Sequence, residues 1–285
     1  MTWTTLISAD ELAQVIDHCL VVDCRYDLAN PKAGAQTYAQ GHIPSAVFID
    51  MDTQLSAAKT GSNGRHPMLP ADAVRALLES IGLTDDLQLI IYDVGGTASG
   101  RLWWMARWIG HAKVAVLDGG LKAWERARFP VSTEPGRVRP AGKLSVRPAL
   151  ATLVDVGTVE TTARGRQDGQ PLVIDARAAD RYRGENETID PIAGHIPGSL
   201  NRPWSQNLRD DGRYKPAPAL RAEFEALLAG HAPSAVINSC GSGVSACNNL
   251  LAMAHAGLDG AALYGGSWSE WCSNPTRPVA TGPQP

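Results

Sequence analysis

The stretch AVINSCGSGVSACNNLLAMAHAG, residues 235–257, contains three local signals in succession. Its first five residues are mainly apolar and include β-branched side chains, which favours a short buried strand. Cys240 follows, and the glycines at 241 and 243 favour a tight turn. From residue 245 onward the pattern is helical. The stretch therefore predicts a strand, a turn and a helix, with a cysteine where the strand ends.

Several segments of the chain occur twice, about 150 residues apart and in the same order. Each pair shares a short motif, and the pairs are LVVDCR (20–25) and LVIDAR (172–177), GHIP (41–44 and 194–197), and LDGGLKAW (117–124) and LYGGSWSEW (263–271). The proline-rich stretch between the copies lacks helical periodicity, which is typical of a linker. We therefore expect two homologous domains, 1–135 and 154–285, joined by a linker at 136–153.

Short apolar runs alternate with helical patterns within each half. The expected strands are 89–93, 114–118 and 235–239, and the expected helices are 71–82, 219–230 and 245–257. This alternation predicts an α/β fold in which each domain is a mainly parallel sheet flanked by helices on both faces. Because functional sites gather at the carboxyl ends of parallel strands, Cys240 stands in a favourable place.

Composition excludes several classes of protein. The 285 residues carry a formal net charge of -3, and Lys and Arg are scattered, so nucleic-acid binding has no electrostatic support. No apolar segment is long enough to span a membrane, and the N-terminus lacks the pattern of a signal peptide. The five cysteines are odd in number and include no Cys-X-X-Cys. We expect a cytoplasmic protein without a metal or an organic cofactor.

The turn after residues 235–239 favours thiol chemistry. Gly241 and Gly243 leave room for backbone N–H groups to converge at the start of a helix, and such a nest favours a thiolate over a thiol. The same groups would stabilise a persulfide or an anionic substrate. A small buried cysteine without a function is the alternative interpretation. The matching stretch of the first half carries Asp93 instead, so only the second half can act through sulfur there.

Together these motifs resemble the tandem-domain rhodanese-type sulfurtransferases over nearly the whole chain. The loop CGSGVS (240–245) is similar to that of the 3-mercaptopyruvate sulfurtransferases, with bacterial thiosulfate sulfurtransferases as the near alternative. The resemblance implies a catalytically empty first domain and a second domain whose Cys240 cycles through a persulfide. Sulfur would pass from a small-molecule donor to cyanide, to thioredoxin or to a low-molecular-weight thiol.

The resemblance also implies roles for other residues. A Ser-His-Asp set that assists the cysteine corresponds to Ser242, His66 and Asp52, of which the last two lie in the first half. Arg181 corresponds to an arginine that binds the substrate carboxylate. The remaining residues implied to bind the substrate belong to the loop, and they are Gly241, Gly243, Val244 and Ser245.

The donor is predicted from charge. Relatives that prefer thiosulfate carry Arg and Lys inside the loop, whereas Gly241 and Ser242 are neutral, which favours a monoanionic keto acid such as 3-mercaptopyruvate. A second arginine expected shortly before GHIPG is missing from ENETIDPIAGHIPG (185–198), and Arg183 is a candidate to replace it. Thiosulfate therefore stays open as the alternative donor.

Other functions remain as alternatives. A cysteine-dependent phosphatase needs an arginine six residues after the cysteine, but position 246 is Ala. A non-catalytic rhodanese scaffold would not need Cys240, whereas a persulfide carrier would use it. A thiol–disulfide oxidoreductase would need a second, resolving cysteine close to Cys240, and the sequence does not offer one. His42 and His195 occur in both GHIP copies and are expected to pack or to shape turns. Cys247, two helical turns after Cys240, is expected to be buried.

Overall fold

The computed structural model describes residues 2–94, 98–137, 139–163 and 170–285. The chain forms two compact units. The first comprises Met1–Ser56, Leu69–Leu150 and Arg209–Tyr214, and the second comprises Ala57–Met68, Ala151–Leu208 and Lys215–Pro285. The segment Ala57–Met68 thus interrupts the sequence of the first unit but belongs to the second. The segment Arg209–Tyr214 interrupts the second unit but belongs to the first. None of the helices in these ranges combines the length and the apolar character needed to cross a bilayer.

The first unit contains a five-stranded sheet with the strand order β1-β5-β4-β2-β3, and all its strand pairs are parallel. Its described helices and strands are β1 (Leu6–Ile7), α1 (Ala9–Val15), a 3-10 helix (Ile16–His18), β2 (Cys19–Asp23), α2 (Ala33–Gln40), β3 (Val47–Phe48), α3 (Ala71–Ser80), β4 (Gln88–Tyr92), α4 (Ala98–Trp108), β5 (Val114–Leu117) and α5 (Gly120–Arg126).

The second unit repeats this arrangement, with the order β6-β10-β9-β7-β8 and parallel pairing. Its described elements are β6 (Thr152–Val154), α6 (Val156–Ala163), β7 (Leu172–Asp175), α7 (Ala179–Arg183), β8 (Leu200–Asn201), a 3-10 helix (Trp204–Asn207), α8 (Ala217–Leu228), a 3-10 helix (Pro233–Ala235), β9 (Val236–Ser239), α9 (Ala246–His255), β10 (Ala262–Tyr264) and α10 (Ser267–Trp271). The predicted α/β fold with two parallel sheets is confirmed.

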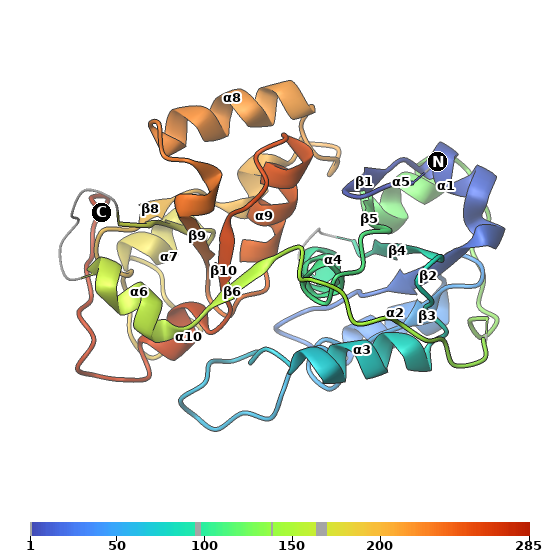
Figure 1. Cartoon of the computed structure of the whole chain (residues 1–285), viewed down its shortest axis with the longest axis horizontal. Helices are drawn as coiled ribbons and strands as arrows, with labels where there is room; N and C mark the ends of the chain where they lie inside the picture. The colour runs from blue at the N-terminus through green and yellow to red at the C-terminus, as the bar shows by residue number, and fades with distance from the viewer. Residues whose placement is uncertain (1, 95–97, 138, 164–169) are drawn as a thin grey trace. The chain divides into compact units, whose positions relative to one another are not determined.

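Helices cover both faces of each sheet (Figure 1). In the first unit, α1 and α5 share one apolar core with β2, β4 and β5, while α4 packs on β4 and β5 and against α3. In the second unit, α6 and α10 share a core with β7, β9 and β10, while α9 packs on β9 and β10 and against α8. The central strands are buried on both faces, which is why they read as continuous apolar runs.

Local sequence signals explain where several elements begin. Ser8 caps α1 by accepting a hydrogen bond from the Glu11 amide, and the Glu11 side chain returns one to the Ser8 amide. These bonds to Ser8 lower the pKa of the Glu11 carboxyl. Pro218 stands in the first turn of α8, where its missing N–H has no partner to lose. The linker predicted at 136–153 reaches into β6, which begins at Thr152.

The two histidines of the GHIP copies have the same structural role in both units. His42 stacks on Tyr38 with a ring-centroid distance of 3.9 Å, and His195 stacks on Tyr182 at 3.8 Å. In each case Nδ1 lies 2.8 Å from the carbonyl oxygen of the same tyrosine. Both histidines are buried. Their expected role in packing is thus confirmed.

Candidate active site

Cys240 lies between the end of β9 at Ser239 and the start of α9 at Ala246, as the sequence predicts. Its side chain is buried, with the residue 1% exposed. The N–H of Gly243 donates a hydrogen bond to Cys240 Sγ over 3.2 Å. Gly243 has a φ of 74°, a left-handed conformation that favours glycine, and this turn directs its amide back at the sulfur. The loop therefore supplies a backbone donor to the thiol sulfur.

A second loop, which follows β10, holds the cysteine from the other side. The Cys240 N–H donates to Ser267 Oγ over 3.1 Å, and this oxygen lies 4.0 Å from Cys240 Sγ. The N–H of Trp268 donates to the Cys240 carbonyl oxygen, and the N–H of Ser269 donates to that of Gly241, each over 2.9 Å. Ser267 has a φ of 54°, which is unusual for a residue with a side chain.

Ser242 and His66 lie in contact in the second unit. His66 Nδ1 is 2.7 Å from Ser242 Oγ although 176 residues separate them in the sequence, and both side chains are buried. The segment Ala57–Met68 brings His66 there, because the Arg65 N–H donates to Ser269 Oγ over 2.9 Å. Gly64 has a φ of 87°, and a Cβ at this position would crowd the Gly266 carbonyl oxygen.

Asp52, the third member of the expected set, belongs to the first unit. Its carboxylate Oδ2 accepts a hydrogen bond from the Tyr26 hydroxyl over 3.3 Å. Its role beside His66 stays a prediction.

Two arginines approach the backbone of Gly241. A Cβ at this glycine would lie 2.9 Å from Arg65 Nη2 and 3.7 Å from Arg181 Nη1. Asp190 joins the two guanidinium groups, with Arg65 Nη1 at 2.5 Å from Oδ1 and Arg181 Nη2 at 3.0 Å from Oδ2. Arg181 also forms a bidentate ion pair with Glu187. Two guanidinium groups therefore lie beside the loop, each paired with buried carboxylates.

Glu187 is ionised in this network. Burial acts to raise the pKa of its carboxyl, but the amides of Asp190 and Ile189 and the Arg181 guanidinium outweigh burial and lower that pKa. A carboxylate that stays charged keeps the Arg181 side chain in one orientation.

Val244 and Ser245 directly precede α9, and Ser245 is its N-cap residue. The Cys247 N–H donates to the Val244 carbonyl and the Asn248 N–H to the Ser245 carbonyl, each over 3.1 Å. Cys247 is fully buried, as expected, and its thiol donates to the Gly243 carbonyl over 3.3 Å. The contribution of Val244 and Ser245 to substrate binding stays a prediction.

The cysteines outside the loop are buried free thiols. Burial raises the pKa of Cys19 and of Cys272 to about 11 in each case. Burial, together with the charges of Asp23 and Asp93, also raises the pKa of Cys24. These three thiols are protonated at neutral pH and are poor nucleophiles. Within the described ranges, no group of three or more His, Cys, Asp or Glu side chains could hold a metal ion.

The first unit has a carboxylate at the place that Cys240 takes in the second. Asp93 follows β4, and the Leu121 N–H donates to its carbonyl oxygen over 3.0 Å, just as Trp268 donates to Cys240. The Asp93 carboxylate accepts a hydrogen bond from the Ser99 amide over 3.0 Å. Residues 95–97 of this loop lie outside the described ranges.

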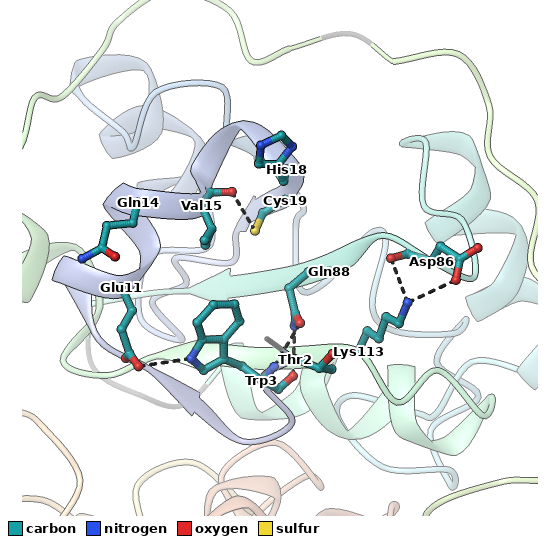
Figure 2. A pocket seen from close by; sticks show the side chains of 10 residues that line it. All are labelled: Thr2, Trp3, Glu11, Gln14, Val15, His18, Cys19, Asp86, Gln88 and Lys113. Carbon is teal, nitrogen blue, oxygen red and sulfur yellow. Dashed lines mark hydrogen bonds and ion pairs between the residues drawn. The ribbon is translucent and has the colours of Figure 1, made fainter.

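A cavity of about 420 Å³ lies in the first unit at the amino-terminal ends of β2 and β4 (Figure 2). Its polar groups are largely paired with one another: Lys113 contacts Asp86 at 3.1 Å, and the Trp3 ring nitrogen donates to Glu11 over 3.3 Å. The lining consists of Thr2, Trp3, Glu11, Gln14, Val15, His18, Cys19, Asp86, Gln88 and Lys113. Asp93 follows the opposite end of β4, so this cavity is separate from the loop that corresponds to the Cys240 loop.

The sequence did not point to four residues of the site: Arg65, Ser267, and the carboxylates Glu187 and Asp190 that pair with the arginines. Arg65 directly precedes His66, and that adjacency was the available signal. Ser267 follows the GG that LYGGSWSEW shares with LDGGLKAW, and its equivalence to Gly120 comes from the hydrogen bonds of Leu121 to Asp93 and of Trp268 to Cys240.

Comparisons with known proteins agree with this geometry. Residues 8–127 and 158–274 each match the Rhodanese-like domain. The chain is 43% identical over 290 residues to a protein of Pseudomonas aeruginosa named "Probable 3-mercaptopyruvate sulfurtransferase", covering 99% of this chain and 100% of that protein. It is 32% identical over 259 residues to the thiosulfate sulfurtransferase of Bos taurus, covering 88% and 84%. The structure of 3-mercaptopyruvate sulfurtransferase from Leishmania major matches with a TM-score of 0.83 and 31% identity, covering 96% and 75%.

Proposed function

The chain belongs to the rhodanese family, and on that premise we propose that it is a sulfurtransferase that moves a sulfur atom from 3-mercaptopyruvate to a thiol through a persulfide on Cys240. The observation that carries this proposal is the sulfur of Cys240 at a strand end, with the Gly243 amide directed at it over 3.2 Å. A backbone donor in a buried site stabilises negative charge on sulfur and needs no reorganisation during the reaction.

The first step forms the persulfide. The Cys240 thiolate attacks the sulfur of 3-mercaptopyruvate, so an S–S bond forms while the C–S bond breaks. The electron pair of the broken bond passes to the carbon, and the resulting enolate takes up a proton to give pyruvate. Ser242 and His66, whose Oγ and Nδ1 lie 2.7 Å apart, form a pair able to supply that proton. Asp52 would fix the orientation of His66.

The second step returns the cysteine to its starting state. A thiolate acceptor attacks the outer sulfur of the persulfide, the S–S bond breaks, and Cys240 leaves as a thiolate. Cyanide would accept the sulfur in the same way and give thiocyanate. We propose thioredoxin or a low-molecular-weight thiol as the acceptor in the cell. A cytoplasmic location suits such acceptors, and the free state of the five cysteines supports it.

The neutral loop and the balanced charges beside it support the choice of donor. Gly241 and Ser242 place no cation in the loop, and the two arginines near Gly241 are offset by Glu187 and Asp190. A monoanionic carboxylate fits this balance better than the thiosulfate dianion. Thiosulfate remains the second candidate, because a relative of the chain is named a thiosulfate sulfurtransferase.

The test compares Cys240→Ser with Cys24→Ala. The first change removes the nucleophile and should reduce sulfur transfer to cyanide by about a thousandfold or more. The second change is a matched control, because the second unit already has an alanine, Ala176, at the position equivalent to Cys24. Cys24→Ala should therefore keep the activity.

Two readouts accompany this test. Mass mapping after exposure to 3-mercaptopyruvate should locate one additional sulfur atom on Cys240. Steady-state assays of the unaltered protein should give a higher kcat/KM for 3-mercaptopyruvate than for thiosulfate. Undiminished transfer by Cys240→Ser would refute the assignment of the nucleophile. A lack of sulfur transfer by the unaltered protein, with either donor, would leave the non-catalytic scaffold as the better interpretation. A higher kcat/KM for thiosulfate would refute the choice of donor alone.

A further inference from the structure

Cys247 is a buried thiol that the proposed sulfur transfer does not use. It stands in the first turn of α9 and is fully buried. Two of its groups bind consecutive carbonyl oxygens of the active loop. Its N–H donates to the Val244 carbonyl over 3.1 Å, and its thiol donates to the Gly243 carbonyl over 3.3 Å. Cys247 therefore fixes the end of the loop that leads into the helix.

Gly243 connects this end of the loop to the sulfur of Cys240. Its N–H donates to Cys240 Sγ over 3.2 Å, and its φ of 74° lies in the left-handed region. Glycine adopts many backbone conformations at little cost, so this one must be maintained by bonds to the residue. The N–H is bonded to the sulfur, and the carbonyl is bonded to the Cys247 thiol. Loss of the bond to the carbonyl would let Gly243 rotate and turn its N–H away from the sulfur.

The beginning of the loop is held by other groups. The carbonyl oxygens of Cys240 and Gly241 accept hydrogen bonds from the amides of Trp268 and Ser269, each over 2.9 Å. These bonds fix the backbone of the cysteine and of the residue after it. The direction of the Gly243 amide depends instead on the far end of the loop, where Cys247 binds.

The first unit differs from the second at both positions. Asp93 stands there in the place of Cys240, and at the same spacing after Asp93 the chain has Gly100 where the second unit has Cys247. Glycine has no side chain that could donate to a carbonyl of the loop. The unit without the sulfur of Cys240 therefore also lacks the thiol that holds the loop.

We propose that Cys247 is a positioning residue for Cys240, because its thiol holds the Gly243 carbonyl and thereby keeps the Gly243 amide directed at the sulfur. The inference rests on the proposed function for its effect on the reaction, whereas its effect on the ionisation of Cys240 needs no sulfur donor. Serine can replace Cys247 in this bond, because its hydroxyl is a stronger donor than a thiol. In helices, serine donates to the carbonyl four residues earlier, which here is that of Gly243.

Three substitutions separate positioning from packing. Cys247→Ser keeps a donor, Cys247→Val fills the space without one, and Cys247→Ala does neither. Rapid-quench measurement of the Cys240 persulfide should give a rate roughly three- to tenfold lower for Cys247→Val and Cys247→Ala, because one neutral hydrogen bond is lost. Cys247→Ser should stay within about twofold of the unaltered protein.

A second measurement uses no sulfur donor. The ultraviolet absorbance of the Cys240 thiolate is followed against pH, as the difference between each protein and the same protein with Cys240→Ser. The midpoint should rise by roughly 0.5–1 pH unit in Cys247→Val and Cys247→Ala, because the thiolate loses the hydrogen bond from the Gly243 amide. It should keep its place in Cys247→Ser.

Cys19→Ala is the matched control. The Cys19 thiol donates to the Val15 carbonyl, also four residues earlier and also over 3.3 Å, but in the first unit. The same kind of bond is thus removed away from the active loop. Cys19→Ala should leave both the rate and the midpoint unchanged.

The rank order of the variants decides between the two roles of Cys247. A full rate in Cys247→Val together with a loss in Cys247→Ser would show that Cys247 only fills space, and it would overturn the inference. An unchanged midpoint in Cys247→Ala would overturn it as well. Neither result would affect the proposed function. If the unaltered protein forms no persulfide, the proposed function fails, and the midpoints then test this inference by themselves.

Discussion

In both units, the strand at the fourth position of the sheet ends in a buried aspartate that pairs with the arginine two residues later. Arg25 contacts Asp23 and Arg177 contacts Asp175, each with Nη2 at 2.7 Å from Oδ2. These pairs explain why LVVDCR and LVIDAR share their Asp and Arg. Each arginine also donates to the carbonyl oxygen of the glycine in its GHIP copy, Gly41 or Gly194, over 2.7 Å, so the pairs support these loops.

The units differ at two equivalent places. The residue after the middle strand is Asp93 in the first unit and Cys240 in the second. Leu121 donates to the Asp93 carbonyl oxygen and Trp268 to that of Cys240. The residue before each donor is left-handed, and it is Gly120 (φ 57°) in the first unit and Ser267 (φ 54°) in the second. The second unit thus combines a thiol with a hydroxyl that contacts the cysteine, whereas the first has neither. At these two places the units therefore differ in the side chains that they carry after equivalent strands.

The largest effect on stability is expected from the shared ion pairs. Arg25→Met and Arg177→Met each leave a buried carboxylate without its partner, which should destabilise the affected unit by about 3–5 kcal/mol. Hydrogen exchange should show faster exchange in β2 and β4 for the first variant and in β7 and β9 for the second. If either change left exchange unaltered, the two pairs would not be equivalent supports.

The next effect concerns Gly120 and Ser267. A Cβ at Gly120 would overlap the Asp93 carbonyl oxygen, so Gly120→Ala should destabilise the first unit by about 2 kcal/mol or more. Ser267→Gly removes the hydroxyl but relieves the left-handed backbone, and these effects on stability are each of order 1 kcal/mol and opposite in sign. Persulfide formation should nevertheless slow roughly tenfold, because Cys240 loses its contact with the hydroxyl.

Thermal unfolding and rapid-quench measurement of the persulfide separate the two changes. Ser267→Ala is a useful companion to Ser267→Gly, since it lacks the hydroxyl but keeps the strain, and it should be the less stable of the two. A Ser267→Gly protein that forms the persulfide at the original rate would show that Ser267 is only a turn residue.

The smallest effect is a pH dependence of stability. Burial lowers the pKa of His111 in the first unit and of His195 and His255 in the second. As the pH falls through about 6.5, these histidines bind protons in the unfolded chain but not yet in the folded units. The free energy of unfolding therefore decreases below that pH and is retained above it. The loss should be larger in the second unit.

Urea unfolding at about pH 7.5 and about pH 5.5 tests this dependence. His255→Gln should weaken the pH dependence of the midpoint, because burial is the cause of its shift and glutamine does not titrate. An identical pH dependence in the variant and the unaltered protein would contradict the assignment to His255.

The sequence determined the repeat, the α/β fold and the place of Cys240. Continuous apolar runs and helical periods are local signals, and strands such as β4 and helices such as α9 begin and end within a few residues of their predicted bounds. Strands of two residues, such as β3 and β8, were not predicted, because so short a run has no period to detect. The cysteine was identifiable because a strand, two glycines and a helix surround it in one continuous stretch.

Only the tertiary structure decided how the groups distant in sequence reach the cysteine, and which of them the motifs had not indicated. His66 and Arg65 lie in the first half of the sequence but belong to the second unit, because the segment Ala57–Met68 packs there. Ser267 reaches Cys240 through the loop after the neighbouring strand. Such partners are far apart along the chain and are brought together by packing and hydrogen bonds, and no periodicity in the sequence encodes that choice.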